Sequence, residues 1–377
     1  MSTLAFYPWL QLRDPHVVDG VHLIPYQRGK SPYESKTQES IDTILARYFN
    51  RPDTQLSKAT LAIFDNNAPT APLSEDQISK LFSITQIITT AGLAQRQFFT
   101  HPLTYCNSQL FKLIVQNFTS ENNAIAITTR RRDGSTQNLI TGITYRVVQA
   151  EHIHSPLAVE IDFPLVDGLL KARQHNDYPS INEAILGFNL ANTDSEDIAE
   201  RVEIVLLCGA FERLFGCKNG KSDDLAKAFC AAFVLSTPLD PKTSPRTDNL
   251  ESGIKSVREI WILDFFRRRN DYAHGRVTTP AQPARWELRE HLILGSFVFS
   301  LALKIVLSRI NAYSLSASDK DAIDIFEALV AIPKLFEPTG HTALPGSWPW
   351  TETMKKANEK AIDRAFEAAA KNGGYFE

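Results

Sequence analysis

Apolar positions follow two different periods along the chain, and the period changes near residue 180. Before that point, short apolar runs such as Val21–Tyr26 and Ala59–Phe64 predict strands. After it, apolar residues recur every three to four positions, as in Ile181–Leu190 and Asp194–Phe215, and this spacing predicts helices. We therefore expect an α+β protein, in which an N-terminal mixed α+β domain over residues 1–180 precedes an all-α helical domain.

A β-hairpin is the clearest strand signal in the first domain. Two segments that favour strands, Ala124–Thr129 and Asn138–Val148, flank an Asp133-Gly134 turn. Shorter apolar runs predict further strands at Leu4–Leu12 and Val159–Phe163.

The first domain also contains one strong helix signal, over Ser74–Phe99. Ser74 is suited to cap the helix, and Gln77 follows three residues later, which is the spacing of a capping box. The next apolar segment, Leu110–Phe118, fits a short helix or a strand equally well. The domain therefore mixes both kinds of element.

The helical domain is expected over residues 181–337, and Asp194 or Ser195 is the expected N-cap of its second helix. Apolar spacing predicts further helices at Asn219–Ala232, Trp286–Ile310 and Asp319–Phe336. Between them, Ser236–Ser252 contains three prolines and predicts a loop, which is either a connector or a mobile cover over a neighbouring site.

Residues 338–377 read as a linker followed by a C-terminal helix. The linker is rich in proline, glycine and tryptophan, and Thr351–Lys371 is polar, alanine-rich and followed by Gly373-Gly374. We expect this helix to pack against a neighbour through Met354, Ile362 and Phe366.

The segment with the most distinctive chemistry is Trp261–Gly275, with the sequence WILDFFRRRNDYAHG. It begins as a buried helix and then changes within one turn to the three arginines of 267–269. Asn270 and His274 are four residues apart and share a helical face. Gly275 is placed where a helix C-terminal glycine is expected, so the polar cluster should lie at the end of the helix.

Arg269 and His274 are suited to work together on a phosphate. Arginine is a permanent, forked hydrogen-bond donor, and histidine is the side chain suited to moving protons near neutral pH. A titratable imidazole beside a permanent cation fits acid–base chemistry at a phosphodiester. The simpler reading is that these polar residues only cap and solvate the helix end.

Glu212 is the candidate partner of Arg269. It lies in the predicted helix Asp194–Phe215, close to a stripe of apolar positions. That stripe is formed by Ile198, Val202, Val205 and Gly209. A carboxylate beside an apolar stripe needs a cation, and Arg269 is the natural candidate.

Charge and composition restrict the possible partners. The net charge is -3, so attraction to nucleic acid would have to come from local clusters such as Arg130–Arg132 and Arg267–Arg269. The four cysteines have no metal or disulfide spacing, which favours a reducing, cytoplasmic location. His152 and His154 are more typical of a surface pair than of a metal site, so we expect no metal.

Targeting and membrane signals are not evident in the sequence. No basic segment followed by an apolar core stands near the N-terminus. The apolar, uncharged run Leu292–Leu303 is too short to span a bilayer. We expect a soluble, cytoplasmic protein without membrane contact.

Arg269–Gly275 resembles the R-N-x-x-x-H motif of the HEPN superfamily, the helical ribonucleases of prokaryotic conflict systems. The AFERLF stretch inside Asp197–Phe215 is similar to the HEPN helix segment that carries an acidic partner for the motif arginine. The resemblance covers roughly residues 181–312. The two-domain layout also resembles that of ApeA-like abortive-infection proteins.

This resemblance implies an endoribonuclease that needs neither a metal nor a cofactor, in an antiviral, abortive-infection or toxin-like system with a phage-derived trigger. A homodimer would bring two motifs into one composite cleft and leave 2′,3′-cyclic phosphate and 5′-hydroxyl ends on a tRNA or mRNA substrate. The implied catalytic residues are Arg269, His274, Asn270 and Glu212, and we expect Arg267, Arg268, Tyr272 and Arg276 to contact substrate.

One departure from the family narrows the subclass. HEPN toxins that are silenced by adenylylation carry a tyrosine two residues after the histidine, and here that position is Arg276. We therefore do not expect a nucleotidyltransferase partner, and the N-terminal domain is the expected sensor or autoinhibitory cover. Two alternatives remain: a non-catalytic HEPN-type module that binds a nucleotide, RNA or protein, and a purely structural interaction protein.

Overall fold

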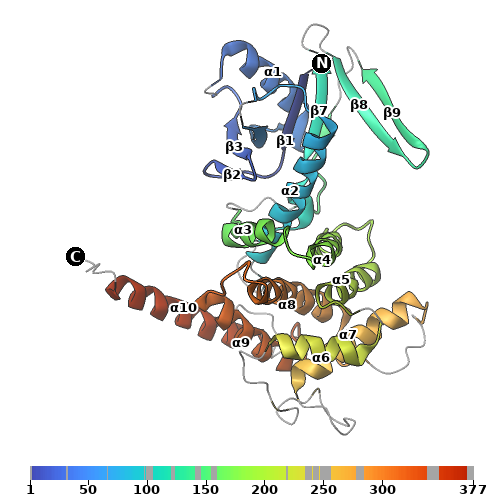
Figure 1. Cartoon of the computed structure of the whole chain (residues 1–377), viewed down its shortest axis with the longest axis vertical. Coiled ribbons are helices and arrows are strands. Elements are labelled where there is room, and N and C mark those ends of the chain that lie inside the picture. Colours follow the sequence, from blue (N-terminus) through green and yellow to red (C-terminus); the bar gives the residue numbers. More distant parts are fainter. Residues whose placement is uncertain are drawn as a thin grey trace. The chain divides into compact units, whose positions relative to one another are not determined.

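The computed structural model of the protein describes residues 2–30, 33–65, 67–96, 98, 105–119, 124–140, 146–153, 159–217, 220–233, 240, 246, 256–276, 284–337 and 348–371 (Figure 1). The chain divides into an N-terminal unit, residues 1–96 with 101–166, and a helical unit, residues 97–100 with 167–377. The α+β class predicted from the sequence is confirmed. The division falls somewhat before the predicted boundary at residue 180.

Seven antiparallel strands of the described residues form one sheet in the order β2-β3-β6-β1-β7-β8-β9. They are β1 (Ser2–Tyr7), β2 (His16–Val18), β3 (Val21–Gln27), β6 (Lys58–Phe64), β7 (Ile114–Thr119), β8 (Ala124–Arg131) and β9 (Gly134–Ile140). A second, three-stranded sheet joins β10 (Val147–Val148), β4 (Tyr48–Arg51) and β5 (Thr54–Gln55).

Helices cover both faces of the central strand β1. Phe6 packs in the apolar cluster that contains the buried side chains of α1 (Ser35–Leu45). Tyr7 points to the other face, where its hydroxyl forms a 2.8 Å hydrogen bond with Thr85 of α2 (Glu75–Ala94). Because neighbouring side chains of a strand point to opposite faces, α1 and α2 lie on opposite sides of the sheet (Figure 1). Burial raises the pKa of Tyr7 to about 12.

Helix α2 confirms the predicted capping box. The Ser74 hydroxyl accepts from the Gln77 N–H, and the Gln77 side chain accepts from the Ser74 N–H. The helix ends at Ala94, before the predicted Phe99. Gly92 lies against the short 3₁₀ turn at Ser108–Phe111, where an added Cβ would lie 2.1 Å from the Phe111 ring. A side chain at this position would therefore force the two segments apart.

The predicted hairpin is confirmed, with shifted bounds. Strand β8 pairs with β9 so that Arg131 faces Gly134, and the second strand therefore begins before the predicted Asn138. The ambiguous segment Leu110–Phe118 is divided between the 3₁₀ turn and β7. The predicted strand Val159–Phe163 is wrong, because helix α3 (Phe163–Ala172) begins there. Its first turn is held by the Asp162 carboxylate, which accepts from the Leu165 N–H at 3.0 Å.

The helices after α3 are α4 (Tyr178–Leu190), α5 (Glu200–Leu214), α6 (Ser222–Ala232), α7 (Val257–Ala273), α8 (Leu288–Arg309), α9 (Ala317–Ala331) and α10 (Thr351–Lys371). The predicted helices in this region are confirmed as elements, with α10 at the predicted bounds. Aromatic rings join three of them: Phe211 of α5 meets Phe265 of α7 and Phe299 of α8 edge to face. The core of the helical unit therefore lies among α5, α7 and α8.

The start of α5 differs from the prediction. Neither Asp194 nor Ser195 caps the helix, which begins at Glu200 after Ala199. Asp194 instead adopts a positive φ of 53°, and the Ser195 hydroxyl accepts a local hydrogen bond from the Asp197 N–H at 3.3 Å. Serine and aspartate form such local turns readily, so the cap-like residues here make a turn that precedes the helix.

Several ion pairs are buried inside the helical unit. Arg258 pairs with Glu327 at 2.7 Å, and Lys304 pairs with Asp319 at 2.7 Å. Arg246 forms a bidentate pair with Glu290 at 2.6 and 2.9 Å. Arg246 comes from the predicted loop Ser236–Ser252, most of which lies outside the described residues. At Arg246 the loop is therefore anchored to the buried part of the helical unit.

Helix α8 is long and apolar enough to cross a membrane by length and composition alone. In the structure, 72% of its most apolar window is buried inside the protein. Its ring contact with α5 through Phe299 is one of the contacts that bury it. This burial is what a core helix of a folded unit requires, and it accounts for the apolar composition of α8.

Candidate functional site: the C-terminal end of helix α7

Helix α7 ends in a Schellman motif that sets the position of the predicted histidine. His274 is the C-cap, and Gly275 adopts a positive φ of 71°. The Gly275 N–H donates to the Tyr272 carbonyl at 3.2 Å, and the Arg276 N–H donates to the Asp271 carbonyl at 2.7 Å. The predicted C-terminal glycine is confirmed. The turn leaves the His274 side chain exposed at the helix end.

Three contacts hold the Arg269 guanidinium in one position. It donates to a Glu212 carboxylate oxygen at 2.8 Å and to the Asn270 side-chain oxygen at 2.8 Å. It also lies over the Phe266 ring, 5.2 Å from the centroid. The Glu212–Arg269 ion pair predicted from the sequence is thus confirmed. The Arg269 side chain is 25% exposed, so a fixed cation remains accessible at the surface.

The packing of α5 against α7 explains why Glu212 meets Arg269. Phe211 and Phe265 are in edge-to-face contact, with ring centroids 6.0 Å apart. Glu212 follows Phe211 directly, and Arg269 lies four residues, or about one turn, after Phe265. The aromatic contact therefore sets the register at which the carboxylate and the guanidinium meet.

The buried face of α5 is not the predicted stripe. Val202, a member of that stripe, is 50% exposed. The buried face is formed by Ile204, Leu207, Cys208 and Phe211, and Glu212 lies at its edge with a side chain 11% exposed. The prediction of a carboxylate beside an apolar face holds because Glu212 is four residues after the fully buried Cys208. Burial, followed by the nearby Glu212 charge, raises the pKa of the Cys208 thiol.

Asn270 links the two central residues of the motif. Its side-chain oxygen accepts from Arg269, and its main-chain carbonyl accepts from the His274 N–H at 3.0 Å. The amide is partly exposed and lies one helical turn before His274, on the same face. The structure therefore brings Arg269, Asn270 and Glu212 into one connected group. His274 stands exposed one turn further along the helix.

The residues expected to contact substrate are divided between surface and interior. Arg276 is exposed and Tyr272 is half-buried. Arg267 is 31% exposed and lies 3.4 Å from Asp264. Arg268 corrects the prediction: its side chain is 7% exposed and lies 3.5 Å from the buried Asp271. Arg268 therefore supports the helix from inside and does not present its charge to a ligand.

Sequence reasoning did not single out Asp264 of α7 and His291 of α8, which form a buried pair. The Asp264 carboxylate is 1% exposed, lies 3.1 Å from His291 Nε2 and accepts from the Arg285 N–H at 3.3 Å. Burial alone would raise the pKa of Asp264, but the His291 hydrogen bond and nearby positive charges hold it below its usual range. A carboxylate inside the apolar run WILDFF was the signal that could have indicated this pair.

The two histidines considered as metal ligands, His152 and His154, do not belong to the site at the end of α7. His154 lies outside the described residues, so the predicted His152–His154 pair cannot be described. Among the residues that the structure describes, no group of three His, Cys, Asp or Glu side chains is placed to hold a metal ion. The end of α7 presents arginine, asparagine and histidine, which suit an anion better than a cation.

Removing the Glu212 side chain should destabilise the protein by about 1–3 kcal/mol, because Glu212→Ala leaves the partly buried Arg269 without its carboxylate. Chemical denaturation of the purified protein measures the change. Glu200→Ala, which removes an exposed glutamate from the first turn of the same helix, is the matched control and should change stability little. Equal stability of both variants would show that the ion pair contributes nothing to the fold.

Comparisons with protein families, curated proteins and solved structures find no match to this chain.

Proposed function

We propose that the helical unit is a HEPN-type endoribonuclease that cleaves RNA without a metal ion. The observation that carries the proposal is the Arg269 guanidinium, fixed by Glu212 and Asn270 on the helix that ends in an exposed His274. A permanent cation stabilises charge on a phosphate, and an exposed imidazole takes or donates a proton. These two groups support attack by a ribose 2′-hydroxyl on its own phosphodiester, and the leaving 5′-oxygen needs a second group as proton donor.

In the proposed reaction, the 2′-oxygen attacks phosphorus while a base removes its proton. The bond from phosphorus to the 5′-oxygen then breaks, and an acid gives that oxygen a proton. The products are a 2′,3′-cyclic phosphate and a 5′-hydroxyl. Neither step of the reaction requires an oxidant or water. His274 is the residue that moves the proton, and Arg269 neutralises the charge on the phosphorane oxygens.

The remaining residues have supporting roles. Glu212 orients Arg269, and its pairing geometry limits the rotamers available to the guanidinium. Asn270 connects Arg269 to the helix end and presents its amide beside the phosphate. Arg276 and Tyr272, which are exposed and half-buried, are the candidates for RNA contacts outside the scissile phosphate.

We further propose that the active form is a homodimer. One imidazole cannot act as base and acid at the same moment, and a second copy supplies the other histidine. Two α7 ends facing one cleft would place one His274 on each side of the scissile bond. The trigger and cellular setting implied by the motif, an antiviral or toxin-like system, belong to the same proposal.

Cleavage should persist in excess EDTA, because the proposed mechanism uses no metal. A substrate with 2′-deoxy or 2′-O-methyl ribose at the scissile position should resist cleavage, because it lacks the attacking hydroxyl. The test incubates purified full-length protein with RNA, and sequencing of 5′-hydroxyl ends locates the cuts. Activity that is lost in EDTA and restored by Mg²⁺ or Mn²⁺, or efficient cutting of DNA, would contradict the mechanism. Saturable RNA binding without cleavage would support the non-catalytic module instead.

A further inference from the structure

The β8–β9 hairpin extends beyond the sheet that holds its base. Strand β8 pairs with β7 only as far as Ala126. Its pairs with β9 continue to Arg131, which stands opposite Gly134. Because β9 is the last strand in the sheet order, residues 127–138 have only each other as strand partners in the described part of the chain. Figure 1 shows β8 and β9 diverging from β7 toward their turn, and we call residues 127–138 the arm.

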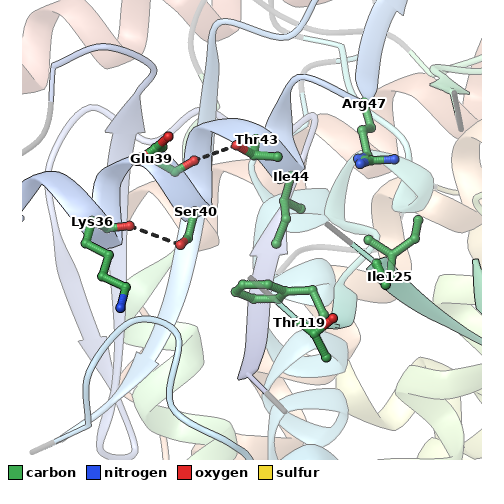
Figure 2. A pocket seen from close by; sticks show the side chains of 10 residues that line it. Lys36, Glu39, Ser40, Thr43, Ile44, Arg47, Thr119 and Ile125 are labelled. Atoms are coloured by element: carbon green, nitrogen blue, oxygen red, sulfur yellow. Dashed lines mark hydrogen bonds between the residues drawn. The ribbon is translucent and has the colours of Figure 1, made fainter. Parts of the chain in front are cut away.

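The base of the hairpin is anchored in the apolar core of the N-terminal unit. Ile125 is 3% exposed and belongs to the cluster that contains Ile44 of α1 and Phe118 of β7. Figure 2 shows Ile125 and Ile44 lining the pocket beside α1. The core therefore fixes the point at which the arm leaves the sheet.

The arm itself has almost nothing to bury. It reads ITTRRRDGSTQN, in which Ile127 is the only large apolar residue. Opposite residues of an antiparallel pair share a face, so Arg131 belongs to one face of the arm and Arg130, opposite Ser135, belongs to the other. A two-stranded ribbon without an apolar face is only marginally stable by itself. Packing therefore does not account for this sequence.

Three consecutive arginines, Arg130–Arg132, occupy the end of the arm. Arg132 is exposed in the turn, beside Asp133. Three positive charges against one negative charge make this end cationic, in a chain whose net charge is -3. The arginines do not serve to protect the edge of the sheet, because the edge strand β9, Gly134–Ile140, carries no charged residue.

Cations on both faces and in the turn suit a groove between two rows of phosphates. In double-helical RNA the major groove is deep and narrow, so its two phosphate rows stand close together. A narrow cationic tip can pair with both rows without reading the bases.

Other partners fit the arm less well. An acidic protein surface would meet only one of its faces. Unpaired RNA is commonly held by aromatic stacking, and the arm contains no aromatic residue. A membrane surface would need apolar side chains to enter it, and the arm offers only Ile127.

We propose that the arm binds the phosphate backbone of double-helical RNA. Arg130 and Arg131, on opposite faces, pair with the phosphates on the two sides of the groove, and Arg132 adds a third contact at the tip. The choice of RNA rests on the proposed function, and it names folded RNA with helical stems as the substrate class. Binding does not depend on cleavage, so the two are measured separately.

Fluorescence anisotropy measures the binding of a labelled 2′-O-methyl RNA stem-loop, which lacks the attacking hydroxyl, to the full-length protein. Wild type should bind the stem-loop more tightly than an unstructured strand of the same length. The combined variant Arg130→Gln, Arg131→Gln, Arg132→Gln should bind it about tenfold more weakly, because three phosphate contacts are lost. The slope of log affinity against log salt should become shallower by about 2–3, since each phosphate contact contributes about 0.9.

The matched control is the combined variant Arg13→Gln, Arg51→Gln, Lys58→Gln. It removes the same charge from exposed positions of the same unit outside the arm, so it should keep the affinity and the slope of wild type. Arg132→Glu provides a second test if the combined arm variant does not fold, because Arg132 is exposed in the turn. This single change should also weaken binding and should lower the slope by about 1.

Equal affinities and slopes of the arm variants and the control would overturn the proposal. Equal binding of the stem-loop and the unstructured strand would also overturn it, as would displacement of the stem-loop by polyglutamate, which would indicate an acidic protein as the partner. Wild type that binds the stem-loop but does not cleave unmodified RNA would contradict the nuclease alone. Cleavage by wild type together with unchanged binding by the arm variants would contradict this inference alone.

Discussion

Replacing His274 by alanine is expected to lower the rate of RNA cleavage by about a hundredfold to ten-thousandfold and to leave the fold intact. The imidazole is the group proposed to move the proton, and general acid–base catalysis contributes a factor of this size. His274 is exposed at the C-cap, and the Schellman hydrogen bonds beside it are formed by main-chain groups that the substitution keeps. The thermal midpoint should therefore remain close to that of wild type, and any toxicity to growing cells should disappear.

The matched control is His175→Ala. His175 is also an exposed histidine of the helical unit, with a side chain 42% exposed; its Nδ1 accepts from the Asp177 N–H at 3.2 Å and lies 3.5 Å from the exposed Asp177 carboxylate. Purified wild type, His274→Ala and His175→Ala are compared by counting 5′-hydroxyl ends on the same RNA. Full cleavage by His274→Ala would contradict the assignment of His274 as the residue that moves the proton.

Glu290→Ala should destabilise the protein by about 3–5 kcal/mol. Glu290 is 1% exposed and accepts a bidentate pair from Arg246. It also accepts the Leu335 N–H at 2.7 Å and caps the start of α8 through the Glu287 N–H at 2.8 Å. The substitution removes the carboxylate that neutralises the buried Arg246 guanidinium, and it leaves two main-chain donors without their acceptor.

Equilibrium denaturation in urea measures this loss, and Glu337→Ala is the control. Glu337 pairs with Lys334 at 2.6 Å on the surface, so its removal should cost less than about 1 kcal/mol. Both variants should be compared with wild type near neutral pH. Burial would raise the pKa of Glu290, but Arg246 and the main-chain donors hold it below its usual range. Its stabilising contribution is therefore present at neutral pH and is lost as the pH falls through the folded-state pKa. Equal losses in both variants would contradict the buried role of Glu290.

The central contact of the candidate site was predictable because it follows from a strong physical rule. A carboxylate next to an apolar face has to find a cation, and Arg269 was the cation at the end of the most distinctive helix. The Schellman end at Gly275 follows from another strong rule, because a positive φ favours glycine. The glycine rule acts locally, whereas the carboxylate rule predicts only the kind of partner, and the packing of α5 against α7 brings Glu212 to Arg269 across 57 residues of sequence.

The sequence could not predict which of the three consecutive arginines is buried and which is exposed. Successive residues of a helix are rotated by about 100° around its axis. The surroundings of Arg267, Arg268 and Arg269 therefore depend on where the neighbouring helices pack. The structure pairs Arg268 with the buried Asp271 and leaves Arg269 at the surface. If the buried face of a helix is predicted one residue away from its true place, the buried and the exposed arginine are exchanged. The prediction for α5 was wrong in this way at Val202.

Two further errors have simple local causes. The segment before α3 alternates like a strand, but Asp162 and Pro164 are typical of a helix start, and this signal outweighed the alternation. Arg246 lies in a stretch rich in proline and polar residues, which indicates a loop but does not reveal a long-range partner. Its acceptor Glu290 lies 44 residues away, and only tertiary packing brings the two together.

The position of β1 in the sheet has a consequence for how the protein folds during synthesis. Strand β1 lies between β6 and β7, and both partners follow it in the sequence, the second of them ending at Thr119. Until the ribosome has released β7, one hydrogen-bonding edge of β1 stays open to pairing with other chains. Such long sequence separation also slows folding, because the intervening chain must be ordered first. Translation that stalls before residue 119 would therefore leave an aggregation-prone nascent chain, which is the kind of intermediate that chaperones bind.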